Sequence, residues 1–140
     1  MRRPADCTDM EVLVPIDESD CSRRALQFAA EFARRYDATL HVVHFAPKSS
    51  ESVEALLADA EAVVDEAGVA GDTELVTDVR FSDLKASDRI GDNILDLVDE
   101  RGYDHVVMGH HGTGRVEGFL LGSAAERVAE DAPVPVSVVP

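Results

Sequence analysis

The stretch that decides the fold covers residues 104–131 and reads DHVVMGHHGTGRVEGFLLGSAAERVAED. Residues 104–108 form a short strand-like run with Val106, Val107 and Met108, and a glycine cluster follows it, which predicts a buried strand and then a loop. A helix is expected to open at Gly122-Ser123, with Ser123 as its N-cap and Glu126 completing a capping box. A helix N-terminus behind a glycine-rich loop offers bare N–H groups to an anion. The stretch therefore predicts a phosphate-binding loop; the alternative is a turn that binds nothing.

The rest of the chain alternates short apolar strands with amphipathic helices. Strands are predicted at residues 11–15, 38–45, 74–81, 104–108 and 134–139. Helices are predicted from a cap at Ser19 or Asp20 to Tyr36, over residues 51–67, over residues 90–101, and from Gly122-Ser123 onward. This alternation predicts a single α/β domain whose parallel sheet is covered by helices on both faces, with right-handed crossovers.

Composition separates this chain from several protein classes. Of its 140 residues, 45% are hydrophobic and 29% are charged, as in a folded domain, and the net charge is −15. That charge disfavours binding to nucleic acid or to anionic membranes. The acids are scattered along the chain and Lys occurs only at Lys48 and Lys85. These features favour adaptation to a salt-rich cytoplasm, as in a halophilic archaeon, over the alternative of an acidic interaction surface.

Features that would direct the chain out of the cytoplasm are not evident. No apolar run reaches the roughly 18 residues of a membrane span. The first residues lack the apolar segment of a signal peptide, and Cys7 and Cys21 are too few for a disulfide framework. We therefore expect a cytoplasmic protein with a flexible N-terminus over residues 1–10.

The glycine spacing Gly109-x2-Gly112-x9-Gly122-Ser123 resembles the motif of ATP-binding members of the universal stress protein family. The resemblance covers residues 11–140. It implies a Rossmann-like fold of the adenine nucleotide alpha hydrolase type, with five parallel strands in the order 3-2-1-4-5. In that order the loops after the first and fourth strands meet at the topological switch point, where open α/β sheets bind ligands. It also implies a role in stress response as a homodimeric sensor or regulator, with ATP, AMP or ADP as ligand together with Mg²⁺.

The predicted nucleotide-binding residues come from these loops and their flanks. They are Pro15, Ile16, Asp17, Phe45, Met108, Gly109, His111, Gly112, Gly114, Arg115, Gly122, Ser123 and Ala124. Asp17 is expected to hold the ribose or Mg²⁺, with a solvated loop acid or helix cap as the alternative. The glycine amides and the Ser123 hydroxyl are expected to hold phosphate.

Three side chains of the predicted site keep two interpretations. Phe45 either stacks on the base or is an ordinary core aromatic. Arg115 either contacts phosphate or is exposed. His111 is interpreted as a loop or ribose contact; a metal site with His110 and His105 is disfavoured, because no Cys or carboxylate follows at a ligand spacing.

The chain carries none of the common catalytic motifs. A Walker lysine, a Gly-x-Ser-x-Gly elbow, a Cys-x-x-Cys pair and a dinucleotide fingerprint after the first strand are all missing from the sequence. Binding without rapid turnover is therefore predicted, with slow ATP hydrolysis as one alternative. A dimeric interaction module that binds no nucleotide is another. The longer polar connector at residues 81–89, where the family has a Gly-x-Pro turn beside the base, favours this alternative, and the intact glycine motif opposes it.

The last predicted strand carries Pro133 and Pro135 and so should lie at an edge of the sheet. The resemblance implies that this strand pairs with its copy in a homodimer, with Val136 and Val138 at the two-fold contact. The alternative is an edge strand short enough to remain unpaired. The protein partners are not predicted.

Overall fold

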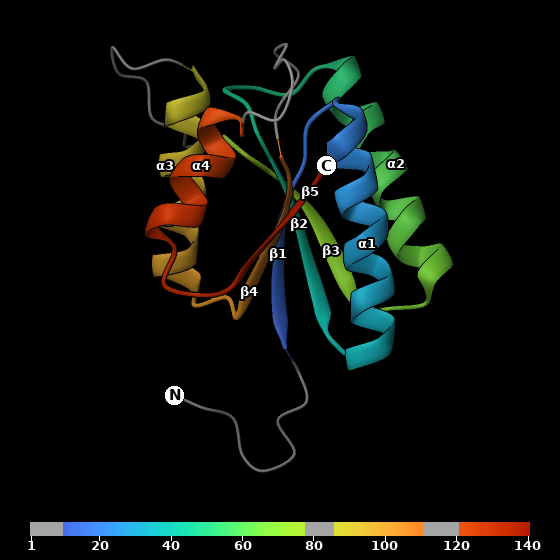
Figure 1. Ribbon diagram of the computed structural model, residues 1–140. Coiled ribbons are helices and arrows are strands. Elements are labelled where there is room, and N and C mark those ends of the chain that lie inside the picture. The colour runs from blue at the N-terminus through green and yellow to red at the C-terminus, as the bar shows by residue number, and fades with distance from the viewer. Residues whose placement is uncertain (1–9, 78–85, 111–120) are drawn as a thin grey trace.

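The computed structural model describes residues 10–77, 86–110 and 121–140. A central sheet is covered by α1 and α2 on one face and by α3 and α4 on the other (Figure 1). The strands are β1 (Glu11–Pro15), β2 (Thr39–Phe45), β3 (Gly71–Val76), β4 (His105–Gly109) and β5 (Val136–Val139). The helices are α1 (Asp20–Tyr36), α2 (Glu51–Ala67), α3 (Ala86–Arg101) and α4 (Ser123–Asp131).

The strand order is β3-β2-β1-β4-β5, and the paired strands are all parallel. The order expected from the resemblance is therefore confirmed. β1 lies between β2 and β4, so the chain winds in one direction after β1 and in the other from β4 onward. The switch point accordingly lies between β1 and β4, with β5 and β3 at the two edges.

Two apolar cores fill the space on either side of the sheet. Alternate residues of β1 show the division: Val12 and Val14 pack toward α1 and α2, whereas Leu13 packs toward α3 and α4. Successive side chains of a strand point to opposite faces, so a strand buried on both faces is apolar throughout. This explains why EVLVP reads as a continuous apolar run.

The first two helices begin and end where their sequences indicate. Ser19 caps α1 by accepting a hydrogen bond from the Ser22 N–H, and Ser50 caps α2 by accepting one from the Val53 N–H. α1 ends at Asp37 in the left-handed conformation (φ 57°), and α2 ends at Gly68 (φ 70°). The predicted bounds of these two helices are confirmed.

The predictions around the third strand and the third helix need correction. β3 covers Gly71–Val76 and not residues 74–81, because it pairs with β2 from Leu40↔Gly71 to Phe45↔Val76. A Cβ at Gly71 would lie 2.8 Å from the Leu40 carbonyl oxygen, so only glycine fits that close pairing. α3 begins at Ala86, so residues 86–89 are helical and not part of a connector. Residues 78–85 lie outside the described part.

The last strand is shorter than predicted and begins at Val136 instead of Val134. The two prolines before it have no N–H to donate; Pro135 contributes only its carbonyl, which accepts from the Val106 N–H at 3.0 Å. The predicted edge position of β5 is confirmed. β2 and β4 each begin one residue later than predicted, and β4 extends through Gly109. Among the described helices, none is long and apolar enough to cross a membrane.

Candidate functional site

The candidate site lies at the carboxyl ends of β1 and β4, the upper end of the sheet in Figure 1. β1 leads into the loop that begins at Ile16, and β4 ends at Gly109. α4 then begins at the same end of the sheet. Because these segments flank the switch point, their side chains and amides are positioned for a ligand there.

Two hydrogen bonds to β2 fix the backbone of Ile16, where the loop after β1 begins. The Ile16 N–H donates to the Val43 carbonyl at 2.8 Å, and the Ile16 carbonyl accepts from Nδ1 of His44 at 2.8 Å. Because a carbonyl only accepts, His44 must carry its proton on Nδ1. The backbone at the switch point is therefore held by β2 on one side of β1.

Asp17 follows directly and is anchored to the start of α1. Its N–H donates to Oγ of Ser22 at 2.8 Å, and its Oδ1 accepts from the Ser19 N–H at 2.8 Å. Within residues 10–77, 86–110 and 121–140, no group donates to its second oxygen, Oδ2. Asp17 thus presents a half-buried carboxylate in a fixed orientation, with one oxygen to which no described group donates.

Gly109 brings the end of β4 against the start of α1. A Cβ at this position would lie 2.7 Å from Sγ of Cys21 and 2.9 Å from the Ser22 backbone nitrogen. Both distances are shorter than side-chain contacts in proteins permit. Glycine at 109 is therefore required by packing, whatever its amide contributes to a ligand.

The start of α4 differs from the prediction. Gly122, in extended conformation (φ −67°, ψ 156°), is the N-cap, and it makes no side-chain capping bond to the helix. Ser123 is the first helical residue, so its prediction as N-cap of a capping box is wrong. The helix begins at Ser123 because of two hydrogen bonds made by Gly122. Its N–H donates to the His110 carbonyl at 2.7 Å, and its carbonyl accepts from the Glu126 N–H at 2.9 Å.

The hydrogen bond between His110 and Gly122 also joins the residues that flank the glycine-rich loop. His110 donates its N–H to the Val139 carbonyl of β5 at 2.8 Å, while its own carbonyl holds Gly122. The first amides of α4 consequently face the switch-point end without a side-chain acceptor from the N-cap residue. Unsatisfied amides at a helix N-terminus are where anions bind proteins.

The structure brings most of the predicted site residues to this end of the sheet. Pro15, Ile16, Met108, Gly109 and Gly122 are buried there, and Asp17, Ser123 and Ala124 are half-buried. Phe45 is only 8% exposed and belongs to the core under α3 and α4, which leaves little of its ring free for stacking. His111, Gly112, Gly114 and Arg115 lie outside the described residues.

Sequence reasoning missed the side chains that hold the site in place. His44 and Ser22 position the β1 loop through its backbone, and Cys21 packs on Gly109. A histidine next to the last residue of an apolar strand was the available signal for His44. No sequence pattern marked Ser22 and Cys21, because their roles depend on how the start of α1 packs against the end of β4.

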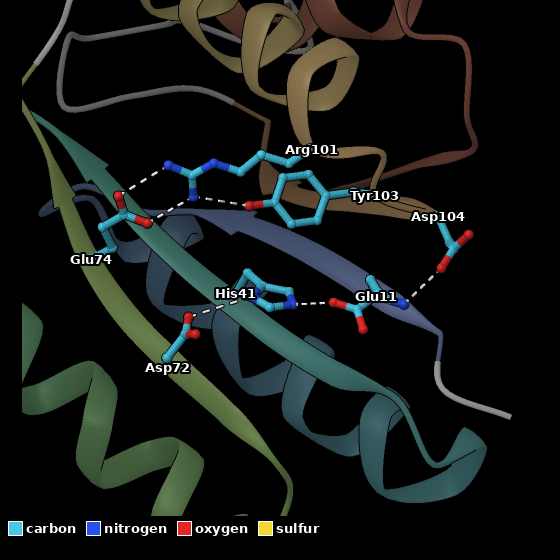
Figure 2. A network of polar contacts seen from close by, with 7 residues as sticks. All are labelled: Glu11, His41, Asp72, Glu74, Arg101, Tyr103 and Asp104. Carbon is cyan, nitrogen blue, oxygen red and sulfur yellow. Dashed lines mark hydrogen bonds and ion pairs between the residues drawn. The ribbon is translucent and has the colours of Figure 1, made fainter. Parts of the chain in front are cut away.

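A second polar cluster lies on the sheet away from this site, near the amino ends of the strands (Figure 2). His41 of β2 lies between two carboxylates: its Nε2 bonds Oε1 of Glu11, and its Nδ1 lies 3.4 Å from Oδ1 of Asp72. Beside it, Arg101 donates to both oxygens of Glu74 at 2.8 and 3.1 Å.

The second cluster ties α3 to the edge of the sheet. Arg101 also donates to the Tyr103 hydroxyl at 3.3 Å. The hydrogen bond from Arg101 lowers the pKa of Glu74, and the bond to Glu74 raises the pKa of Arg101. Nowhere in the described part of the chain do three or more His, Cys, Asp or Glu residues form a group suited to a metal ion. We interpret the cluster as structural.

The fold and the two loops define an α/β protein with a candidate ligand site at the switch point of a parallel sheet. The model of the universal stress protein family matches residues 10–140, and the chain belongs to this family. A universal stress protein of Methanocaldococcus jannaschii is 28% identical, over 92% of this chain and 81% of that protein.

Solved structures of similar proteins include two nucleotide complexes. A universal stress protein from Archaeoglobus fulgidus in complex with dAMP is 27% identical with a TM-score of 0.70, covering 94% of this chain and 98% of that one. A universal stress protein in complex with cAMP is 26% identical with a TM-score of 0.70, covering 94% and 96%. Proteins of this fold and family therefore include nucleotide binders.

Proposed function

We propose that this protein binds an adenine nucleotide, with ATP and Mg²⁺ as the first choice, and acts in the stress response as a homodimeric regulator. The proposal is carried by two groups at the same end of the sheet. One is the N-terminus of α4, whose N-cap residue Gly122 makes no side-chain capping bond, and the other is the fixed carboxylate of Asp17. One group offers hydrogen-bond donors and the other offers acceptors. A nucleotide, with its anionic phosphates and its ribose hydroxyls, needs both kinds of group.

The two groups are connected by a continuous set of contacts. Asp17 bonds Ser22 at the start of α1, and the start of α1 packs on Gly109 at the end of β4. His110 follows Gly109 and holds Gly122 at the start of α4. A ligand with phosphates at α4 would therefore direct its ribose toward the loop after β1.

Asp17 fits two roles toward such a ligand. Its Oδ2 would accept from a ribose hydroxyl, or would bind Mg²⁺ that is mainly coordinated by phosphate oxygens. The metal would supply positive charge beside the phosphates, which matters in a protein of net charge −15. The Ser123 hydroxyl, which does not cap the helix, would donate to phosphate.

The choice of adenine rests on the relatives crystallised with cAMP and dAMP. Phe45 is buried in the core, so we assign it the role of supporting the site from below and not of stacking on the base. The proposed contacts of this chain are thus to phosphate and ribose, through the glycine-rich loop, α4 and Asp17.

Calorimetric titration of ATP–Mg²⁺ in concentrated KCl tests the proposal, with AMP as a second ligand. Saturable binding at one nucleotide per chain is expected. Gly122→Val should abolish this binding in a folded protein, because the new side chain covers the first amides of α4. Ala129→Val, at an exposed position of the same helix, is the matched control and should bind normally.

Two results would contradict the proposal. One is the absence of heat with both nucleotides from a protein that circular dichroism shows to be folded. The other is unchanged affinity in folded Gly122→Val. The first would favour an interaction module that binds no nucleotide, and the second would move the phosphate site away from α4.

The homodimer part of the proposal rests on β5. This strand lies at an edge of the sheet, and its four residues Val136–Val139 are all half-buried. Antiparallel pairing with a second β5 would satisfy the outer backbone groups and bring Val136 and Val138 to the two-fold axis. Light scattering at increasing protein concentration would test this, with a dimer mass as the expected result.

A further inference from the structure

The two edges of the sheet differ in charge. β3 carries Asp72 and Glu74 on its edge, both paired with basic groups of the same face. Charged side chains on an edge strand discourage pairing with another chain. β5 has no such protection, since residues 132–140 contain no charged side chain. Of the two sheet edges in the described residues, the β5 edge is therefore the better suited to another copy of the sheet.

A row of aromatic side chains runs along α1 at intervals of four residues. The rings of Phe28 and Phe32 are 6.3 Å apart, and those of Phe32 and Tyr36 are 4.8 Å apart. Phe28 is 46% exposed and Tyr36 is 60% exposed. We call Phe28, Phe32 and Tyr36 the aromatic ladder. Large aromatic side chains left this exposed in a row are unusual unless they meet a partner.

The ladder faces the β5 side of α1. Arg24, one helical step before Phe28, donates from Nε to the Pro140 carbonyl at 2.7 Å. The Phe32 ring lies 5.2 Å from the ring of His105 in β4, and Nε2 of His105 hydrogen-bonds Oγ of Ser137 in β5 at 2.9 Å. Figure 1 shows the C-terminal end of the chain beside α1. The ladder and the β5 edge are therefore one continuous surface.

The surface formed by α1 and β5 carries less negative charge than α2 does. α1 contains four arginines and two acids, whereas α2 contains six acids and no basic residue. Two copies of a chain with net charge −15 repel each other over most of their surfaces. The β5 edge adds no charged side chain to this repulsion, and on α1 the carboxylate of Glu31 is paired with Arg34 and Arg35.

We propose that the aromatic ladder of α1 and the β5 edge together form a self-complementary surface that binds a second copy of this chain. The inference rests on the proposed homodimer and adds a second contact layer to it. Antiparallel pairing of two β5 strands about an axis perpendicular to the sheet continues the sheet without turning it over. Both α1 helices then lie on the same face, one on each side of the axis, with their ladders turned toward each other.

The interface acquires a layer on each face of the sheet. Val136 and Val138 pack on the α3–α4 side, and the ladder lies on the α1–α2 side. A four-residue strand pair alone is too small for the roughly 1,200 Å² that a stable interface buries. The half-exposed rings of Phe28 and Tyr36 from both copies would add on the order of 400 Å² of buried surface.

The test compares Phe28→Glu and Tyr36→Glu with Gln27→Glu by light scattering and sedimentation in concentrated KCl. Gln27 is the exposed neighbour of Phe28 and receives the same charge, so Gln27→Glu is the matched control. Each ladder variant places a pair of carboxylates across the two-fold axis. We expect the dimer dissociation constant to rise at least about tenfold, while Gln27→Glu remains dimeric. Tyr36 ends the helix and is the more exposed, so its variant preserves the test if Phe28→Glu does not fold.

The outcomes separate this inference from the proposed function. Dimeric wild type with both ladder variants still dimeric would overturn the ladder and leave β5 pairing intact. A wild type that is monomeric at high concentration would overturn the ladder and the homodimer together. Monomeric ladder variants that bind ATP–Mg²⁺ as the wild type does would support the ladder and show that nucleotide binding is independent of it.

Discussion

At the residue scale, Gly109 is a glycine of the candidate site that is also needed for the packing of β4 against α1. Glycine in the loop motif was interpreted as giving phosphate access to the backbone. In the structure its missing side chain allows β4 to meet the first turn of α1, with Cys21 and Ser22 in direct contact. The conformation of the Asp17 loop depends on the same turn through Oγ of Ser22. Packing at Gly109 and the position of Asp17 are therefore coupled.

Gly109→Ala should accordingly destabilise the protein by about 1–3 kcal/mol, the usual cost of overpacking a core. The Ser22 backbone nitrogen cannot move as a flexible side chain would, so Cys21→Ala in addition should restore only part of the loss. Urea unfolding measures both effects. Asp59→Glu, which adds one carbon at an exposed position of α2, should change nothing. Wild-type stability of Gly109→Ala would refute this account of the glycine.

At the scale of elements, α3 and α4 are joined by a close approach and an ion pair. A Cβ at Gly91 of α3 would lie 2.9 Å from Cβ of Arg127 in α4. Arg127 in turn pairs through Nη2 with Oδ1 of Asp92 at 2.9 Å. Asp92 is buried, whereas Arg127 is half-exposed. The guanidinium of Arg127 therefore neutralises a buried carboxylate of α3 that lies against α4.

Arg127→Met keeps the packing of the side chain but leaves the Asp92 carboxylate without this cation. We expect a loss of about 1–2 kcal/mol, less than for a fully buried pair because solvent reaches Arg127. Asp92→Asn in the Arg127→Met background should recover part of that loss. A double-mutant cycle by urea unfolding measures the coupling. Additive effects of the two substitutions would mean that the pair does not hold the helices together.

The elements also show how far the sequence predicts the structure. α1 and α2 begin within one residue of the prediction, because Ser19 and Ser50 are local caps and the apolar period is clear. β3 was displaced, because its position is set by pairing with β2 and not by its own pattern. The Ser123 cap was wrong, because a bond from Gly122 to His110 decides where α4 begins. Features set by local signals were predictable from the residues, whereas features set by contacts distant in sequence were missed or, like the strand order, came only from the family resemblance.

On the scale of the whole molecule, negative charge is distributed unevenly over the surface. α2 carries six acids and none of the basic residues, and its last turn has Asp65 and Glu66 where a helix dipole favours cations. Such an arrangement opposes folding in dilute buffer through self-repulsion. Salt shortens the range of this repulsion from about 10 Å at 0.1 M to about 3 Å at 1 M.

The melting temperature should therefore rise with KCl concentration. The variant Glu61→Gln, Asp65→Asn, Glu66→Gln should be more stable than wild type by about 1 kcal/mol in low salt, from a smaller charge and a better dipole. Its advantage should shrink in concentrated KCl, where wild type is already screened. Glu51→Gln, which removes an acid from the first turn of the same helix, should give no gain. Thermal unfolding across a KCl series measures these differences. Equal salt dependence of the triple variant and wild type would show that α2 is not where the repulsion acts.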